Sequence, residues 1–343
     1  PLPPLAHVEF DAHGLRVERN LAIPMRDGVR IYADVYRPRQ PQVDLPLLLS
    51  WSPYGKHALS NKVFWPHSGV DPAWLSELTP FEGPDPVFWC ARGVAVVVVD
   101  PRGAWLSEGD FHHHGRQEAE DCHDAIQWLA GRPWSNGRVG MTGVSYLAVV
   151  QYLAASLRPP ALAAINPWEG FSDFYREFAT HGGIPETGFL PRAAQSTRYS
   201  LQRCEDTLAN VQAHPLIDAF WRSKEIDLEA IVTPAYVVAS WSDQGLHLRG
   251  TLEAEAIEVP AAGASTTTIV EAAPDSLANP DAIVLGRSIR TDANTVFVVD
   301  GAASTASAFF GGTWGLTRFE VERISGGGLR AVRVEASSLE QYF

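Results

Sequence analysis

Residues 137–155 read GRVGMTGVSYLAVVQYLAA and contain the turn that decides the fold. A short apolar strand over Arg138–Thr142 leads to Ser145, and an apolar helix follows to about Ser156. A serine on such a strand-to-helix turn is raised above the carboxyl edge of a sheet, where the first helix amides can hold a developing oxyanion. Gly143 keeps the turn uncrowded. The residues alone leave two interpretations of Ser145 open, a nucleophile and an ordinary helix N-cap.

The neighbouring segments predict an α/β fold around this turn. The apolar runs Leu45–Trp51 and Gly93–Asp100 are typical of strands buried on both faces of a parallel sheet. Apolar residues recur at helical spacing over Glu118–Leu129, and Ala161–Asn166 is again apolar. Residues 20–40 predict a hairpin around an Asp-Gly turn. This alternation of strands and helices favours a mostly parallel sheet.

The texture of the sequence divides the chain into five predicted parts. A helical insertion interrupts the core, and the strand pattern resumes at Thr233–Ser240. The segment that follows the core has no lysine and gives no clear prediction of order. The predicted parts are a first core part over 1–170, a helical cap over 171–230, a second core part over 231–255, a divergent segment over 256–312, and the start of a β domain over 313–343.

Composition excludes several classes of protein. The net charge of −13 is dispersed, which argues against a nucleic-acid partner because phosphate binding needs a basic face. No apolar run reaches the roughly 18 residues that a membrane span needs. The three cysteines, Cys90, Cys122 and Cys204, are too far apart for a disulfide framework or a metal site. We therefore expect buried thiols in a cytoplasmic protein without a metal.

Asp243 is the candidate acid partner of Ser145. It lies at the carboxyl end of the predicted strand Thr233–Ser240, and the order serine, then aspartate, then histidine is that of α/β-hydrolase triads. Such an aspartate orients a histidine and stabilises its charged form. The residues alone also allow Asp243 to be an ordinary strand-end turn residue.

Six stretches agree in order and spacing with one known family. They are IPMRDGVRIYADVYRP (23–38), WSPYGK (51–56), DPRGAWLSEG (100–109), EAEDCHDAIQWLAGRPWSNGRVGMTGVSYLA (118–148), INPWEGFSDFYRE (165–177) and SWSDQGLHLRGTLE (240–253). Together they resemble the cocaine esterase and Xaa-Pro dipeptidyl-peptidase-like hydrolases of the peptidase S15 type. The resemblance covers residues from about 15 to 253. It departs at Ala148, where the family usually has the last glycine of the elbow.

The resemblance implies an α/β-hydrolase core with a helical cap and a jelly-roll-like C-terminal β domain, of which the chain would carry a truncated part. It also implies cleavage of a small ester or amide through an acyl-enzyme on Ser145, with Asp243 orienting the base. The oxyanion hole would consist of the Tyr54 hydroxyl and the Tyr146 backbone amide. No cofactor is implied, and self-association stays open.

The general base is missing from this pattern. No histidine follows His247, and residues 259–270, where the base should fall, read VPAAGASTTTIV. His247 is too close to Asp243 in sequence to bridge to the serine, and His112–His114 are interpreted as a solvated loop. His57, near the predicted oxyanion loop, is a weak candidate. The catalytic histidine is therefore unassigned.

Three alternatives to an intact esterase stay open. The first is an inactive relative that binds acyl compounds or a partner protein. The second is a damaged coding sequence, with a frame disturbance between codons 250 and 315 that erased the base. The third is an aminopeptidase acting on Xaa-Pro chains, which needs an acidic or aromatic site for the substrate ammonium.

Other residues near the predicted site receive structural interpretations. The turn at Asp100–Gly103 is expected to shape the rim of the site, and Trp168 with Glu169, or Trp241, could line an acyl pocket. Four acidic residues of the helix after it are expected on a solvated face: Glu118, Glu120, Asp121 and Asp124.

Overall fold

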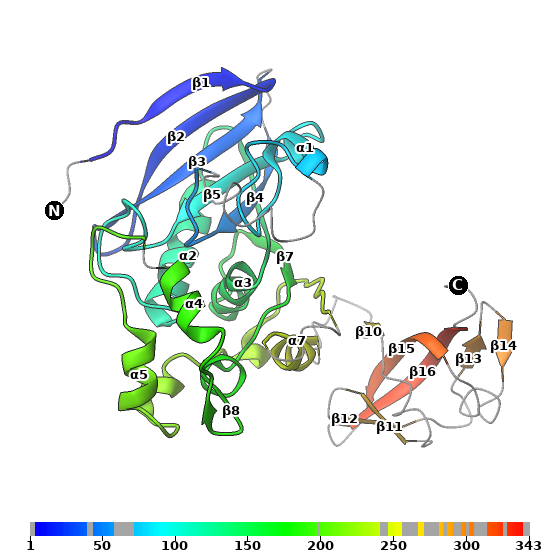
Figure 1. Cartoon of the computed structure of the whole chain (residues 1–343). Helices are drawn as coiled ribbons and strands as arrows, with labels where there is room; N and C mark the ends of the chain where they lie inside the picture. Colours follow the sequence, from blue (N-terminus) through cyan, green and yellow to red (C-terminus); the bar gives the residue numbers. More distant parts are fainter. Residues whose placement is uncertain are drawn as a thin grey trace. The chain divides into compact units, whose positions relative to one another are not determined.

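The computed structural model describes residues 4–39, 44–57, 72–197, 199–240 and 246–255, and the backbone of strands between 267 and 338. Contacts divide the chain into two compact units, Pro1–Ile257 and Glu258–Phe343. Figure 1 shows the first unit in blue to yellow and the second in dark yellow to red. Each unit is described by itself.

A seven-stranded mixed sheet forms the centre of the first unit, in the order β1-β2-β3-β5-β4-β6-β7. Its first four strands pair antiparallel, and β5, β4, β6 and β7 pair parallel. The fold class is therefore α/β, as the sequence predicts. The strands are β1 (Val8–Ala12), β2 (Leu15–Pro24), β3 (Arg30–Pro38), β4 (Leu45–Trp51), β5 (Ala95–Asp100), β6 (Ser135–Val144) and β7 (Leu162–Trp168).

The two apolar runs identified in the sequence form the middle of this sheet. Every residue of β5 is buried, and β4 is buried at all positions but two. Strands β2 and β3 form the predicted hairpin, in which Gly28 has a φ of +83° that a side chain would disfavour. These predictions are confirmed.

Helices α2 (Arg116–Ala130) and α3 (Tyr146–Ser156) pack against the parallel strands, and a short helix, α1 (Pro86–Cys90), precedes β5. Ten of the eleven residues of α3 are buried, which explains why its sequence is apolar on all sides. The strand-turn-helix prediction around Ser145 is therefore confirmed in its local structure.

Helices follow β7 and include the region predicted as a cap. They are η4 (Phe174–Ala179, a π-helix), α4 (Leu190–Ser196), α5 (Thr207–Ala213), α6 (Ala219–Arg222) and the 3₁₀ turn η5 (Leu228–Ala230), with the short strands β8 (Thr180–His181) and β9 (Ile184–Pro185) between the first two. A 3₁₀ turn, η3 (Pro72–Trp74), precedes α1, and α7 (Leu248–Glu255) ends the first unit.

The strand predicted over Thr233–Ser240 is only partly formed. The segment runs parallel beside β7 through two isolated bridges, Ile165 with Ala235 and Trp168 with Val238. Pro234 lacks an amide hydrogen, so it contributes to this pairing only through its carbonyl, which accepts from the Ile165 amide at 2.9 Å. The predicted segment therefore lies beside the sheet as expected, but it forms isolated bridges instead of a continuous strand.

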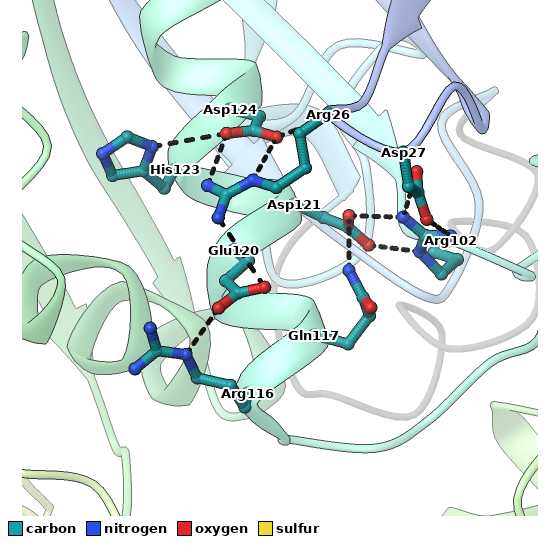
Figure 2. Close-up of polar contacts among 9 residues, drawn as sticks. All are labelled: Arg26, Asp27, Arg102, Arg116, Gln117, Glu120, Asp121, His123 and Asp124. Atoms are coloured by element: carbon teal, nitrogen blue, oxygen red, sulfur yellow. Dashed lines mark hydrogen bonds and ion pairs between the residues drawn. The ribbon is translucent and has the colours of Figure 1, made fainter.

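The acidic face of α2 is less solvated than predicted. Arg102 holds Asp121 through two hydrogen bonds and also pairs with Asp27, while Arg26 pairs with Asp124 and Glu120 (Figure 2). Asp121 is fully buried. The expectation of a solvated face is therefore wrong for Asp121.

The second unit is built of strands. β15 (Trp314–Ile324) and β16 (Gly328–Ser338) form an antiparallel hairpin, which agrees with the β alternation of their sequence. The segment 256–312, which gave no clear prediction, contributes five further strands to this sheet. They are β10 (Thr267–Val270), β11 (Asp281–Val284), β12 (Arg287–Arg290), β13 (Val296–Val299) and β14 (Ala302–Ser304).

Two general expectations can be compared with the described residues. None of the helices in the described part of the chain is long and apolar enough to cross a membrane. All three cysteines are free thiols, of which Cys90 and Cys122 are buried and Cys204 is partly buried.

Candidate active site

Ser145 lies on a strained turn between β6 and α3. Its backbone has φ +60° and ψ −116°, an unusual conformation for a residue with a side chain. The Ser145 amide donates to the Trp168 carbonyl at 2.9 Å, so the turn is held by the end of β7. Gly143 has a φ of +148°, and a Cβ there would lie 2.5 Å from the Leu147 Cβ. Only glycine fits at position 143, as the elbow prediction requires.

The departure from the family pattern at Ala148 is accommodated locally. Ala148 is fully buried. Across from it is Gly170, where an added Cβ would lie 3.3 Å from the Ala148 methyl and 2.6 Å from a ring carbon of Tyr152. The absence of a side chain at Gly170 therefore leaves room for the extra methyl group.

The loop that follows β4 carries Tyr54 and is firmly anchored. The buried Lys56 donates to Asp100 through its backbone amide at 2.8 Å and its ammonium at 3.0 Å. The Trp105 indole donates to the Pro53 carbonyl at 2.9 Å. Asp100, expected only to shape the site rim, thus fixes the loop that presents Tyr54.

The Tyr54 hydroxyl reaches the nucleophile candidate. Its hydrogen-bonding neighbours include the Ser145 hydroxyl and the Glu82 carboxyl. Burial raises the pKa of Tyr54 well above its usual value, so the phenol keeps its proton. The Phe81 ring packs edge-on against Tyr54 with ring centroids 5.2 Å apart. The structure therefore brings together Tyr54 and Ser145, two of the residues predicted for the site.

Glu82 is a residue that the sequence reasoning missed. Burial raises its pKa to about 8, and the contact with Tyr54 opposes this shift. Its carbonyl accepts from the Val144 amide at 3.0 Å, so its loop is attached to the strand that ends at Ser145. The surrounding sequence, TPFEGPDP over 79–86, indicates only a turn-rich loop. No sequence signal distinguished this glutamate from a solvated one.

Tyr146, the residue after Ser145, interacts with another glutamate, Glu118, which is buried. Its hydroxyl lies 2.8 Å and 2.9 Å from the two carboxylate oxygens of Glu118. Glu118 also accepts from the Trp51 indole at 3.0 Å and from the His114 amide at 2.9 Å. Burial raises the pKa of Glu118 to about 7 despite these donors. The expectation that Glu118 is solvated is therefore wrong.

The position of Glu118 could have been found from helical spacing. Cys122, Ala125 and Leu129 follow it on one buried stripe of α2. The backbone amide of Tyr146 begins α3, and amides of the first helical turn have no acceptor within the helix. The Tyr146 amide is therefore left without an acceptor inside α3, and the Tyr146 side chain is held by Glu118.

The expectation of a solvated histidine loop is wrong for two of the three residues. His113 and His114 are buried, and the ring nitrogens of His113 contact the hydroxyls of Thr197 at 2.9 Å and Thr207 at 3.1 Å. The His114 ring packs 4.0 Å from the Tyr146 ring, and burial holds its pKa well below the usual value. Only His112 is exposed. The cap helices cover this loop, which its polar sequence did not reveal.

A pocket that is partly open to solvent lies beside Ser145. Four phenylalanines dominate its wall, and none of the described lining residues is acidic. The lining comprises Tyr54, His113, His114, Ser145, Tyr146, Phe171, Phe174, Phe178, Phe189, Leu190, Ala193, Ala194, Ser196, Thr197 and Thr207. Trp168, one of the predicted pocket residues, is half exposed and is absent from this lining.

Two of the predicted residues lie outside the described part of the chain, and the two candidate histidines are not seen to contact Ser145. Asp243 and Trp241 are both outside the described residues. His57 lies 2.8 Å from Asp34 and 3.1 Å from the Lys56 ammonium, so its ring nitrogens already face charged groups. His247 is buried, and its ring stacks on Phe171.

One group of side chains in the described residues has the spacing of metal ligands: His7, Glu9 and Glu18. It lies at the edge strand β1 and its neighbour β2, and it is not part of the pocket beside Ser145. Glu18 is already neutralised by an ion pair with Arg37. We therefore assign no metal to the candidate site.

Curated proteins match about half of this chain. The cocaine esterase of Rhodococcus sp. (strain MB1 Bresler) is 39% identical over 160 residues, which is 47% of this chain and 25% of that protein. A putative Xaa-Pro dipeptidyl-peptidase of Rhodopirellula baltica is 28% identical over 191 residues, 46% of this chain and 30% of that protein. The chain thus spans between a quarter and a third of the length of these relatives.

Solved structures show the same fold. A CocE/NonD family hydrolase from Staphylococcus aureus is 42% identical with a TM-score of 0.66, over 70% of this chain and 43% of that one. An α-amino acid ester hydrolase, at 20% identity and a TM-score of 0.54 over 72% of this chain and 47% of that one, supports the fold alone. The profile of the X-Pro dipeptidyl-peptidases (S15 family) matches residues 27–203. The chain therefore belongs to the S15 family of serine hydrolases.

Proposed function

We propose that the protein is a serine hydrolase that cleaves a carboxylic ester through an acyl-enzyme on Ser145. The observation that carries this proposal is the contact of the Tyr54 hydroxyl with a serine on a strained strand-to-helix turn. A backbone conformation of this kind costs energy and is found where it serves a site.

The proposed mechanism combines the Ser145 hydroxyl with two hydrogen-bond donors beside it. Ser145 Oγ attacks the ester carbonyl carbon, and the carbonyl oxygen becomes an oxyanion. The Tyr54 hydroxyl and the Tyr146 amide donate to that oxyanion. The alcohol leaves, and water then releases the acid. The Ser145 proton needs a general base, which we propose Asp243 to orient; the base itself stays unassigned.

The pocket supports an ester with a neutral, apolar acyl group over an Xaa-Pro peptide. The free amino terminus of such a peptide is an ammonium, and a buried cation needs an anionic partner. None of the described pocket residues is acidic, whereas phenylalanines line the wall. An aryl or branched alkyl acyl group would bury its surface there without leaving a charge unpaired.

Paired substrates test this proposal. We expect turnover of p-nitrophenyl benzoate to exceed that of Ala-Pro-p-nitroanilide, and Ser145→Ala to reduce ester turnover by at least about 10³-fold. Ser156→Ala, at the other end of the same helix, serves as the matched control and should retain activity. Ester turnover that survives Ser145→Ala would contradict the proposal, and preference for the anilide would favour the peptidase.

A second candidate function follows from the missing base. No histidine follows His247 in the sequence, so the chain could be an impaired relative that binds acyl compounds, or the product of a damaged coding sequence. Sequencing the coding DNA across codons 250–315 in all three frames separates these cases. A shifted frame that restores a histidine indicates a damaged copy, and an intact frame together with background turnover favours the binding protein.

A further inference from the structure

The loop that carries Glu82 packs on both the nucleophile and the oxyanion tyrosine. Its carbonyl accepts from Val144, directly before Ser145, and its neighbour Phe81 packs against the Tyr54 ring. Glu82 itself has a φ of +60°, which is unfavourable for a residue with a side chain. A backbone held in this way aims the Glu82 side chain at Tyr54 rather than at solvent.

The polar surroundings of Glu82 are sparse. Its Oε2 atom is buried and has no hydrogen-bond partner among the described residues. Tyr54 is the titratable group that interacts with its carboxyl in the described part of the chain. A carboxylate oxygen that is buried without a donor is costly when the group is ionised, so the neutral acid is favoured over an unusually wide pH range.

The Tyr54 hydroxyl has one proton, and its hydrogen-bonding neighbours among the described residues include the Glu82 carboxyl and the Ser145 hydroxyl. A carboxylate can only accept, so an ionised Glu82 draws the Tyr54 proton toward itself. Tyr54 can then only accept a hydrogen bond from Ser145. A protonated Glu82 can donate to the Tyr54 oxygen, which leaves the Tyr54 proton free to be donated toward Ser145. The direction of the whole chain of hydrogen bonds therefore depends on one proton.

We propose that Glu82 is a positioning residue that, in its protonated form, turns the Tyr54 hydroxyl toward the substrate oxyanion. This inference rests on the proposed function of Ser145 and Tyr54. Glu82 touches no reacting atom and acts through Tyr54. No bond is made or broken at Glu82; its proton only sets which oxygen the Tyr54 proton faces.

The consequence for activity is a loss at alkaline pH. The pKa of Glu82 is raised to about 8, so the competent protonated form predominates below that pH and disappears above it. A glutamine at this position has an amide that can always donate to Tyr54. We therefore expect Glu82→Gln to retain kcat at pH 7 within about threefold and to abolish the decline of kcat above pH 8. Glu77→Gln, a change of an exposed glutamate before the same loop, should leave the decline unchanged.

The experiment combines two readouts on the full chain. The first is the pH profile of kcat for phenyl benzoate, with phenol quantified by chromatography so that detection does not depend on pH. The second is the titration of ¹³C-labelled glutamate carboxyls by NMR, with Glu82→Gln used to assign the Glu82 signal. We expect that signal to titrate near pH 8 and the alkaline decline to be absent in the variant.

The outcomes separate this inference from the proposed function. Turnover that requires Ser145 but keeps its alkaline decline in Glu82→Gln overturns the inference alone. A Glu82 signal that titrates in the ordinary range of glutamate, near pH 4.5, also overturns it, whether or not esters are cleaved. Absence of any turnover that depends on Ser145 overturns the proposed function and the inference with it.

Discussion

Two glutamates contact the two tyrosines beside Ser145, and they differ in how fully they are satisfied. Glu118 is buried, whereas Glu82 is partly buried. Glu118 accepts from Tyr146, Trp51 and His114. Glu82 interacts with Tyr54 and keeps a buried oxygen without a partner among the described residues. A satisfied carboxylate fixes its surroundings, whereas an unsatisfied one can change its protonation state at little structural cost. We therefore assign Glu118 to stability and Glu82 to function.

Removing the two tyrosine hydroxyls tests this contrast most strongly. We expect Tyr54→Phe to lower kcat by about 10²–10³-fold, because it removes an oxyanion donor. Tyr146→Phe should leave kcat within about tenfold, since its backbone amide remains, and should lower the free energy of unfolding by about 1–3 kcal/mol. Ester kinetics and urea denaturation of both variants measure these effects. Equal losses of kcat in the two variants would remove the contrast.

Tyr146 and Ser145 lie on the turn between β6 and α3, which Gly143→Ala should disrupt. The added methyl meets the Leu147 side chain and forces an alanine into a glycine conformation. We expect a loss of more than about 2 kcal/mol of unfolding free energy. The matched control is Gly137→Ala, which also has a positive φ but open space around it, and it should cost about 1 kcal/mol. Similar costs for the two variants would show that the elbow is not tightly packed.

Glutamine substitutions compare how much Glu118 and Glu82 each contribute to the free energy of unfolding. Glu118→Gln replaces an acceptor oxygen by a donor amide among three buried donors, and should cost about 2 kcal/mol at pH 8. Glu82→Gln should cost less than about 1 kcal/mol, because few donors depend on Glu82. Urea denaturation of both variants compares these costs. A larger cost for Glu82→Gln would reverse our assignment.

The pH dependence of stability gives the finest distinction. The pKa of each carboxyl is raised in the folded state, to about 7 for Glu118 and about 8 for Glu82. Each contribution to folding is therefore complete below the unfolded pKa near 4.5 and is lost as pH rises through the folded pKa. Between pH 7 and 8 the decrease in unfolding free energy with pH should come mainly from Glu82. It should not exceed about 1.4 kcal/mol per pH unit. If the wild type and Glu82→Gln lose stability in parallel over that interval, Glu82 does not titrate there.

The sequence predicted the framework of this site better than its surroundings. The runs Leu45–Trp51 and Gly93–Asp100 and the turn at Ser145 carry strong local signals, because burial and backbone strain restrict the residues that fit. The contacts of Glu82 and of His114 depend on loops and cap helices distant in sequence. Their residue types are polar and common in solvated loops, so no local pattern marked them as parts of the site. The strand near Thr233–Ser240 was predicted too regular because one proline limits its pairing.

Covalent labelling of Ser145 tests the central claim most directly. Incubation with diethyl p-nitrophenyl phosphate, followed by peptide mass mapping, reports whether an activated serine lies beside an oxyanion hole. We predict a single diethylphosphoryl adduct on Ser145, absent in Ser145→Ala and formed about 100-fold more slowly in Tyr54→Phe. An unlabelled Ser145, or labelling that is as fast without the Tyr54 hydroxyl, would contradict the account.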